Sequence, residues 1–470
     1  MDSVFTVAQI RRAEEATGDL LASGELMQRA ASGLASVVLD ELGDRPRGRR
    51  VLLAVGSGNN GGDALWAGVR LLRRGVRVDA WRTADAVHEE GWAAFVAAGG
   101  REVDAMSALE ALVDADLVVD GVLGIGGRGG LRGAAAVFAQ ACADTQTPVI
   151  AVDLPSGLEG DSCVALPSFA ADVTVTFGGR KACQVLQPAA SRCGRVVVVD
   201  IGLDLGEPEL WTWSAADVAA HYPWPGPDSD KYARGVVGVD TGSATYPGAA
   251  VLATMGAVYG GTGMVRYLGA ARDAVVAALP NVVTAAGRVQ AWLVGSGWGS
   301  RPDASAIVAR CLGEGLPTVV DADALFALGD ATLGGHVLLT PHAGELARLL
   351  SVERSAVEAD PAGHARRAAS ETGAVVLLKG ASQYVAEPPG RVTLAVGGPA
   401  WTAQAGSGDT LAGLCAAMLA AGRPAGEAAL LGASLQAIAA RNFPGPRPPQ
   451  DLVRHVADVI PTLRSPGLER

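Results

Sequence analysis

Short apolar, β-branched runs alternate with longer amphipathic stretches along most of the chain. In the first half, helical periodicity covers 7–20 and 26–42, and strand-like runs follow at 51–55, 76–81, 117–120, 148–152, 173–177 and 196–200. Strands separated by helical segments require right-handed crossovers and form a mostly parallel sheet that is covered on both faces. The first half is therefore predicted to be a Rossmann-like, doubly wound α/β domain.

The same alternation restarts in the second half. Strand-like runs occur at 236–240, 263–267, 290–294, 317–321, 337–340, 374–379, 383–386 and 391–396, and helical stretches follow at 408–421, 425–441 and 450–463. This pattern predicts a second αβα sandwich, in which the last three closely spaced strand runs form antiparallel hairpins. Residues 204–230 between the halves are rich in proline and are expected to lack regular structure. We therefore divide the chain into domains 1–213 and 214–470.

Composition restricts the class of protein. The 470 residues are 49% hydrophobic, but no apolar run approaches 18 residues and the first residues lack a basic segment followed by an apolar one. We expect neither a membrane span nor a secretory signal, and hence a cytoplasmic protein. The net charge of −11 argues against a nucleic-acid partner. Six scattered cysteines without C-x-x-C spacing argue against disulfides or a zinc site.

The segment 403–410, A-Q-A-G-S-G-D-T, places Asp409 at the start of an apolar helix. Glycines let the backbone approach an anion, the free N–H groups of a helix start favour negative charge, and an aspartate there can take a proton from a hydroxyl group. The string alone also fits an ordinary glycine-rich helix start. The helix dipole lowers the pKa of Asp409 whereas burial raises it, so the sequence leaves the direction of the net shift open.

A second strand-to-helix corner, 340–345, reads T-P-H-A-G-E. Two such corners in one domain predict a nucleotide site, in which His342 either contacts the ligand or caps the helix. Only three of the 38 basic residues are lysine, namely Lys181, Lys231 and Lys379, so each is a candidate for a position that needs a compact ammonium group, and Lys379, which ends a buried-looking strand, has the strongest case. Asp321 and Asp323 are interpreted as helix caps and are left outside the site.

The first strand-like run is followed by the turn 56–61, G-S-G-N-N-G. This turn matches the G-x-G-x-x-G spacing of dinucleotide-binding folds, and Asp79 lies near the expected acidic position. Asn59, Asn60 and Asp63 add side-chain amide and carboxylate groups to this turn. Such groups suit the binding of a cation or a sugar better than the binding of a phosphate by backbone amides alone. The turn is therefore a weak argument for a dehydrogenase.

Two further polar loops, 120–130 and 153–157, follow strands of the same predicted sheet. The carboxyl ends of parallel strands share one edge, where ligands usually bind. We expect Asp120, Asn60 and Ser156 to share a monovalent cation, and Asp153 to transfer protons. Each aspartate alone also fits a turn or a helix cap, but three polar turns at one edge favour a site.

Twelve short sequence motifs in this chain resemble the motifs of a known family. In chain order they are GNNGGDA, DGVLGIGGRGG, DLPSG, TFGGRKA, DIGL, DKYARG, YPGAAVLA, GSGWG, DADAL, TPHAGE, KGAS and GSGD. With them, nearly the whole chain resembles the bifunctional NAD(P)H-hydrate repair family, in which an epimerase domain of the YjeF N-terminal type precedes a ribokinase-like dehydratase domain.

The resemblance implies a chemistry. The substrate is NADH or NADPH damaged by addition of water to the nicotinamide ring, present as R and S epimers. The first domain interconverts the epimers, and the second dehydrates the S form at the expense of ADP, by phosphorylation of the ring hydroxyl and elimination of phosphate. Potassium in the first domain and a homo-oligomer are implied as well, and the phosphoryl transfer itself predicts magnesium on the phosphates.

The resemblance also assigns site residues. It implies epimerase substrate contacts from Asn59, Asn60, Gly61, Gly62, Asp63, Gly124, Ile125, Gly126, Gly127, Arg128, Gly129, Gly130 and Asp153. Potassium ligands are Asn60, Asp120 and Ser156. In the dehydratase domain, substrate contacts are Ala249, Gly297, His342 and Asp409, and nucleotide contacts are Lys379, Gly380, Ala381, Ser382, Gln383 and Gly408. Asp153 and Asp409 are the expected catalytic residues.

Some positions depart from the family pattern, and two other functions stay open. Ala64, Ser296, Ser407, Gln383 and Cys183 stand where the family usually has Gly, Pro, Thr, Thr and Gly. Of these, Gln383 bears directly on nucleotide contact because it is bulkier than threonine. One alternative is a ribokinase-type small-molecule kinase whose first domain only binds ligand. The other is that one half has become a scaffold or a ligand sensor.

Overall fold

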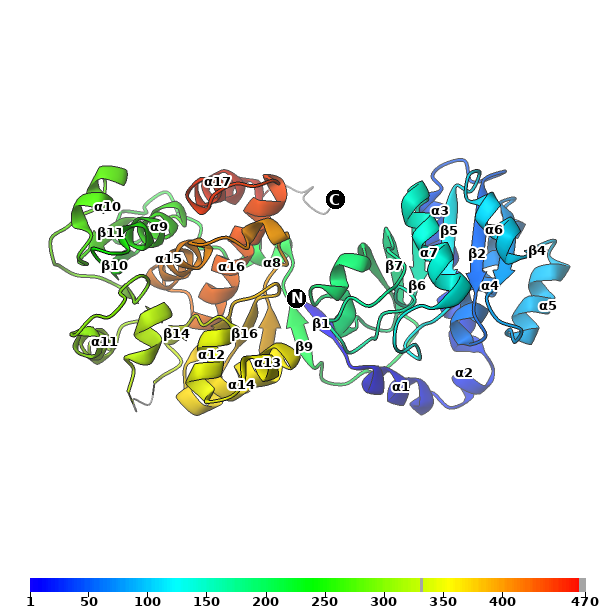
Figure 1. Cartoon of the computed structure of the whole chain (residues 1–470), viewed down its shortest axis with the longest axis horizontal. Coiled ribbons are helices and arrows are strands. Elements are labelled where there is room, and N and C mark those ends of the chain that lie inside the picture. The colour runs from blue at the N-terminus through cyan, green and yellow to red at the C-terminus, as the bar shows by residue number, and fades with distance from the viewer. Residues whose placement is uncertain (330–332, 465–470) are drawn as a thin grey trace. The chain divides into compact units, whose positions relative to one another are not determined.

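The computed structural model describes residues 1–329 and 333–464. The chain forms two compact units, Ser3–Glu209 and a second unit that contains Met1–Asp2 together with the residues from Leu210 onward (Figure 1). Each unit is an α/β sandwich, as predicted. In the described part of the chain, no helix is both long and apolar enough to cross a membrane.

The first unit is built on a seven-stranded sheet of order β4-β3-β2-β5-β6-β7-β8, and all neighbouring strands pair in parallel. Its strands are β2 (Arg50–Val55), β3 (Arg77–Arg82), β4 (Arg101–Val103), β5 (Leu117–Gly121), β6 (Val149–Val152), β7 (Val173–Phe177) and β8 (Arg195–Val199). Helices lie at α1 (Val7–Ala16), α2 (Asp19–Ala22), α3 (Glu25–Glu41), α4 (Asn59–Arg73), α5 (Glu89–Ala97), α6 (Ala105–Ala111) and α7 (Gly133–Thr145). All six strand runs expected from the sequence are present, and the short strand β4 is an addition.

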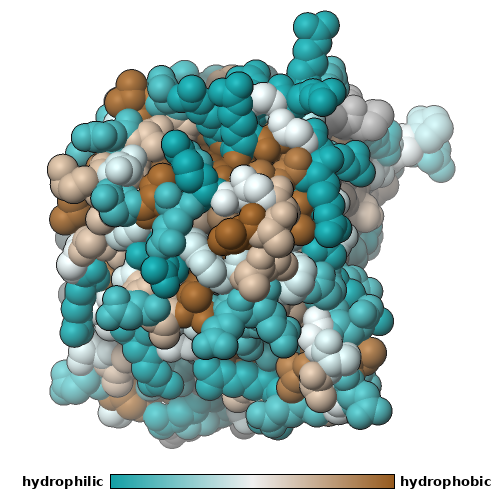
Figure 2. Space-filling model, turned by 90° about the vertical axis from the view of Figure 1, so that its right-hand side faces the viewer, coloured by the Kyte–Doolittle hydropathy of each residue, from teal (hydrophilic) through white to brown (hydrophobic). Residues whose placement is uncertain are grey.

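Both faces of this sheet are buried. Val51, Leu53 and Val55 of β2 belong to a core shared with α3, α4 and α5, whereas Leu52 and Ala54 belong to a second core shared with α6 and α7. Strands buried on both faces read as continuous apolar runs, which is why the sequence located them well. The face of the first unit drawn in Figure 2 shows hydrophobic residues in small groups among hydrophilic ones.

The second unit has a ten-stranded sheet of order β1-β9-β17-β16-β15-β14-β13-β12-β10-β11. Its strands are β1 (Asp2–Val4), β9 (Leu210–Thr212), β10 (Val236–Asp240), β11 (Met264–Tyr267), β12 (Ala291–Val294), β13 (Thr318–Val320), β14 (Val337–Leu339), β15 (Val375–Leu378), β16 (Tyr384–Ala386) and β17 (Val392–Leu394). Strands β10 to β15 pair in parallel, and β15, β16 and β17 pair antiparallel, as their close spacing predicted.

Helices cover both faces of the second sheet. They are α8 (Ala215–His221), α9 (Pro247–Tyr259), α10 (Arg272–Ala278), α11 (Ala304–Gly313), α12 (Ala343–Leu350), α13 (Arg354–Ala359), α14 (Pro361–Thr372), α15 (Ser407–Ala420), α16 (Ala425–Asn442) and α17 (Pro449–Thr462). Helices α9, α15, α16 and α17 share one core with the strands. Helix α15 is nearly all buried, and a Cβ at Gly413 would overlap the Ala253 carbonyl of α9, so glycine permits this close packing.

Two local predictions are wrong. The periodic segment 7–20 is broken after Ala16, because the chain turns at Gly18, whose φ of 53° is left-handed. The segment 204–230 is not irregular throughout. It contains β9 and α8, and Ser214 caps α8 by accepting a hydrogen bond from Asp217 N. The compact units separate after Glu209, and β9 pairs with β17 in the second sheet.

Candidate functional sites at the two sheet edges

In the first unit, the turn between β2 and α4 brings two backbone segments into contact. A Cβ at Gly61 would overlap the Gly56 carbonyl oxygen, and a Cβ at Gly56 would overlap the Val122 carbonyl oxygen. No side chain caps α4 at Gly58, so the first-turn N–H groups lack a partner within the helix. The turn therefore presents backbone donors, and the side chains of Asn59 and Asn60, at the carboxyl edge of the sheet.

Asp120 and Ser156 form a buried pair behind this edge. Ser156 donates its N–H to Asp120 Oδ2 at 2.7 Å and its hydroxyl to Asp120 Oδ1 at 2.6 Å, and Leu123 N donates to Ser156 Oγ at 2.7 Å. Burial raises the pKa of Asp120 to about 7, and the hydrogen bonds from Ser156 oppose the rise. The Asp120 carboxyl group therefore accepts hydrogen bonds, but no cationic side chain among the described residues contacts it.

Asp153 is held by a lysine that the sequence did not place in the site. Lys181, which is 0% exposed, donates to Asp153 Oδ1 at 2.5 Å and to Thr176 Oγ1 at 2.7 Å. The other carboxylate oxygen of Asp153 accepts the Ile125 N–H at 3.1 Å. Asp153 itself has a left-handed φ of 66°, which aspartate tolerates better than most residues. The scarcity of lysine was the sequence signal that could have added Lys181 to the site.

These groups surround a cavity of about 390 Å³. Its lining includes Asn59, Asn60, Asp63, Gly124, Ile125, Gly126, Gly127 and Asp153 from the predicted set, together with Lys181. Arg128, Gly129 and Gly130 are not among the lining residues, and Gly129 N instead donates to Glu159 at 3.0 Å. Gly61 and Gly62 lie behind the lining in α4, and Asp120 and Ser156 are buried next to it. A second cavity, of about 430 Å³, shares Glu14, Asn59, Asp63 and Phe177 with the first.

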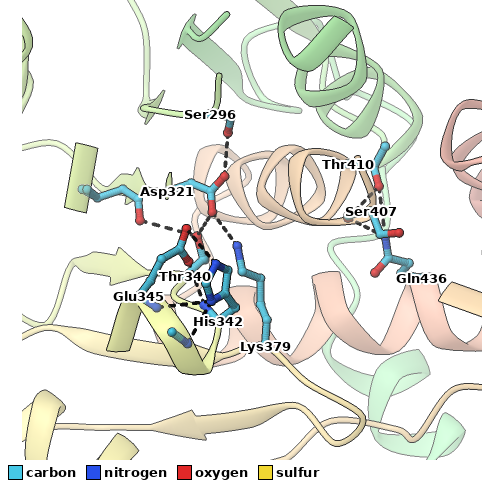
Figure 3. Close-up of polar contacts among 11 residues, drawn as sticks. Ser296, Asp321, Thr340, His342, Glu345, Lys379, Ser407, Thr410 and Gln436 are labelled. Carbon is cyan, nitrogen blue, oxygen red and sulfur yellow. Dashed lines mark hydrogen bonds and ion pairs between the residues drawn. The ribbon is translucent and has the colours of Figure 1, made fainter. Parts of the chain in front are cut away.

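In the second unit, Asp321 is the centre of the polar contacts at the carboxyl edge (Figure 3). Its carboxylate accepts hydrogen bonds from Ser296 Oγ at 2.7 Å, from Thr340 Oγ1 at 2.7 Å and from Lys379 Nζ at 2.8 Å. These residues follow or end the neighbouring strands β12 to β15. The interpretation of Asp321 as a helix cap is wrong, because its side chain makes no capping hydrogen bond. Asp323, the other residue left outside the site, accepts Gly299 N at 2.8 Å.

Lys379 connects this cluster to the start of α15. A Cβ at Gly408 would lie 3.3 Å from Lys379 Nζ, so the KGAS and GSGD segments meet. Burial lowers the pKa of Lys379, but the carboxylates of Asp321 and Glu345 outweigh it and leave the pKa raised. An ammonium group beside the free N–H groups of a helix start is the arrangement that binds phosphate.

Asp409 follows Gly408 in the first turn of α15. Burial raises the pKa of Asp409 to about 7, the charge of Asp321 adds to the rise, and Lys379 opposes it. The direction of this pKa shift, which the sequence left open, is therefore upward, and burial is its largest cause. Ser407, which the family usually has as Thr, donates to the carbonyls of Thr402 and Gln404 at 2.6 and 2.7 Å, and this holds the turn that presents Asp409.

The remaining predicted residues lie near the same edge. His342 caps α12 by accepting hydrogen bonds on Nδ1 from Gly344 N at 3.0 Å and Glu345 N at 3.2 Å, and its Nε2 lies 3.5 Å from Glu345 Oε1. A Cβ at Gly297 would overlap Ala249, so these two positions touch. Gln383 donates to the Gly380 carbonyl at 3.1 Å and closes the 380–383 loop. Gly380 and Ala381 are exposed, and Ser382 is buried.

Among the described residues, no group of three or more His, Cys, Asp or Glu side chains could hold a metal ion. Five of the six cysteines are buried and Cys163 is partly exposed, and all six are free thiols, as expected. The departures at Ser296 and Cys183 are both accommodated: Ser296 binds Asp321, and Cys183 packs in a small buried cluster.

Comparisons with known proteins agree with this arrangement. A family model described as NAD(P)H-hydrate dehydratase matches residues 237–462, and one described as YjeF-related protein N-terminus matches 23–183. The chain is 47% identical to a bifunctional NAD(P)H-hydrate repair enzyme of Mycobacterium tuberculosis over 444 residues, covering 91% of each.

A relative and a solved structure each correspond to part of the chain. An NAD(P)H-hydrate epimerase of Clavibacter michiganensis is 44% identical and covers 43% of this chain and 91% of its own length. A ribokinase-like superfamily protein of Enterococcus faecalis has a TM-score of 0.50 at 20% identity, covering 54% of this chain and 96% of that one, which shows the fold alone.

Proposed function

Because the chain belongs to the family of bifunctional NAD(P)H-hydrate repair enzymes, we propose how its two sites divide the repair of hydrated NADH and NADPH. The first unit is the epimerase and the second is the nucleotide-dependent dehydratase. The observation that supports this division best is that each unit holds a buried aspartate in an ion pair with a lysine at the carboxyl edge of its sheet.

In the epimerase site, the hydrated nicotinamide ring enters the cavity between α4 and the loop after β5. The first turn of α4 and the N–H groups of Gly124 and Gly126 bind the polar parts of the dinucleotide. Asp153 takes the proton of the ring hydroxyl or of an attacking water, and Lys181 holds its carboxylate in place.

In the dehydratase site, Lys379, the 380–383 loop and the N–H of Gly408 bind the nucleotide phosphates, and ADP is the proposed phosphoryl donor. Asp409 removes the proton of the ring hydroxyl as this hydroxyl attacks the phosphorus. The hydroxyl has then become a phosphate ester, and elimination of phosphate restores the dihydropyridine. Ala249, Gly297 and His342 Nε2 contact the substrate. The homo-oligomer and the cytoplasmic location remain predictions.

Two cations complete the proposal. Magnesium reduces the charge on the nucleotide phosphates when it is bound there. Potassium is proposed at Asp120, Asn60 and Ser156, whose oxygen donors fit a hard monovalent cation. The Asp120 carboxyl is buried without a cationic side chain in contact, and Asn60 Nδ2 is buried without a hydrogen-bond partner among the described residues. The buried carboxyl group without a cationic partner supports a cation at this position, whereas the unpaired amide N–H of Asn60 can donate only to an acceptor such as the substrate.

We expect potassium to stabilise the first unit. The apparent melting temperature of the full chain should be higher in potassium chloride than in tetramethylammonium chloride of equal concentration, because an ion that binds only the folded state adds to its stability. Differential scanning fluorimetry measures this, and Asp120→Asn should reduce the difference. If the unmodified chain has the same melting temperature in both salts, potassium does not bind at this site.

The experiment that tests the function is a dehydration assay on a mixture of the R and S hydrates of NADH. We expect the absorbance of NADH to return when ADP and magnesium are present, and the whole mixture to be consumed. Omitting ADP or chelating magnesium should stop the reaction, and ATP in a parallel assay tests the donor preference. A stable phosphorylated product without NADH would instead identify a small-molecule kinase.

The pH dependence of dehydration should follow Asp409. Only its carboxylate can accept a proton, so the rate should fall as the pH drops below about 7, where burial has placed the pKa. Asp321→Asn removes a neighbouring negative charge, which lowers the pKa of Asp409 and moves this fall to lower pH. Initial rates of dehydration between pH 5 and 9 measure both profiles. If the pH profile of Asp321→Asn coincides with that of the unmodified chain, the group that titrates is not Asp409.

A further inference from the structure

The epimerase cavity holds a second carboxyl group whose surroundings are opposite to those of Asp153. Asp153 forms an ion pair with Lys181. Asp63 lies in the first half of α4, is 8% exposed, and lines both the cavity that contains Asp153 and the neighbouring one. Among the described residues, none forms an ion pair with Asp63 or donates a hydrogen bond to its carboxyl group. Asp63 therefore faces the space that the substrate ring would occupy.

The charged groups around Asp63 are mostly negative. Glu14 of α1 and Asp153 face the same cavity, and Glu90 and His88 line the adjoining one. Lys181 is engaged by Asp153, and Arg11, the other basic residue of the cavity lining, donates to the Ile125 carbonyl at 3.3 Å. Burial raises the pKa of Asp63 well above its usual value, and the charges of Asp153 and Glu14 add to the rise. Burial and these neighbouring charges favour the protonated form of Asp63, whereas Asp153 forms an ion pair with Lys181.

We propose that Asp63 is a second catalytic residue of the epimerase, which donates a proton to the leaving hydroxyl while Asp153 accepts one from the incoming water. The two residues come from different elements, α4 after β2 and the loop after β6, and they line one cavity. This inference rests on the proposed function of the first unit.

The reaction balances with these two groups. Water adds to an enamine at the carbon next to nitrogen, so the ring hydroxyl sits on a carbon bonded to the ring nitrogen. Asp63 gives its proton to that hydroxyl, the C–O bond breaks, water leaves, and the nitrogen lone pair forms an iminium ion with a planar carbon. A second water attacks the other face, the new C–O bond forms, and Asp153 takes the released proton. In the opposite direction Asp153 is the acid and Asp63 the base, and no co-reactant is consumed.

The test uses the full chain without ADP, so that dehydration does not occur, and subtracts the spontaneous rate. Asp63→Asn should lower kcat for epimerisation by about 100-fold or more, the usual contribution of a general acid, with KM changed by less than about 3-fold. The rate of the unmodified chain should fall at high pH as Asp63 ionises, and the residual rate of Asp63→Asn should lack this fall. Asp44→Asn, the same chemical change at an exposed position outside both cavities, should match the unmodified chain.

A second measurement does not depend on any variant. In water enriched in ¹⁸O, each epimerisation by the unmodified chain should place one solvent oxygen on the ring, which mass spectrometry detects. Epimerisation with the original oxygen retained would overturn the proposal, and so would unchanged kcat in Asp63→Asn or a loss seen only in KM. Dehydration by Asp63→Asn after ADP is added confirms that the chain is intact. If the unmodified chain fails to epimerise the hydrates, it is the proposed function that fails.

Discussion

Asp409→Asn should reduce ADP-dependent dehydration by about 100-fold or more while epimerisation stays unchanged, because the amide cannot accept the hydroxyl proton. The substitution keeps the shape of the side chain in the first turn of α15. It also leaves the ion pair between Lys379 and Asp321 in place, so phosphate binding should persist. The measurement is the return of NADH absorbance from purified S hydrate, together with the rate at which the R and S forms interconvert.

A matched control is available in the same unit. Asp451 lies in the first turn of α17 and is partly exposed, and Asp451→Asn makes the same chemical change away from the site. It breaks only an exposed ion pair with Arg454, which is worth about 1 kcal/mol or less. If Asp409→Asn dehydrates the hydrate as fast as the Asp451→Asn control, Asp409 is not the base.

Asp153→Asn should show the opposite behaviour. With a mixture of R and S hydrates and ADP, the unmodified chain should consume both forms, whereas the variant should consume the S fraction and then stop at a plateau. Further loss should occur only at the spontaneous rate. The physical reason is the loss of the carboxylate that accepts a proton, and we expect epimerisation to slow by about 100-fold or more. Asparagine suits the left-handed backbone at this position.

The stability of the Asp153 variant needs its own control. Removing the carboxylate leaves the ammonium of Lys181 buried and unpaired, and breaking a buried pair from one side costs about 3–5 kcal/mol. The double variant Asp153→Asn/Lys181→Met removes both charges and should melt at a higher temperature than the single variant. Complete consumption of the mixture by either variant, faster than the spontaneous conversion, would rule out Asp153 as the epimerase base.

Lys379 shows where prediction from sequence succeeded and where it stopped. Its rarity and its place at a strand end identified it as a site residue, because the carboxyl ends of parallel strands share one edge. Its partner Asp321 was missed, since the two residues are 58 positions apart. An aspartate after a strand fits a cap equally well, and only the order of strands β12 to β15 brings Ser296, Thr340 and Lys379 around it.

The charges of the carboxyl groups also depended on tertiary structure. The motifs placed Asp63, Asp153 and Asp409 at the starts of helices or after strands, but the charge of each depends on burial and on neighbours from other elements. Asp409 carries a raised pKa because it is buried and lies near the charge of Asp321, and Asp153 has a lysine from a later loop. Neither balance can be read from the residues beside them in the chain.

The sequence by itself determined the two α/β units, their buried strands and the loops that bear the chemistry, because hydrophobic periodicity and glycine-rich turns are local properties of the chain. Tertiary structure decided which charged groups pair, which carboxyl groups stay buried and which predicted residues line a cavity. Those outcomes depend on distances between segments far apart in sequence, and on the low polarity that only a packed interior provides.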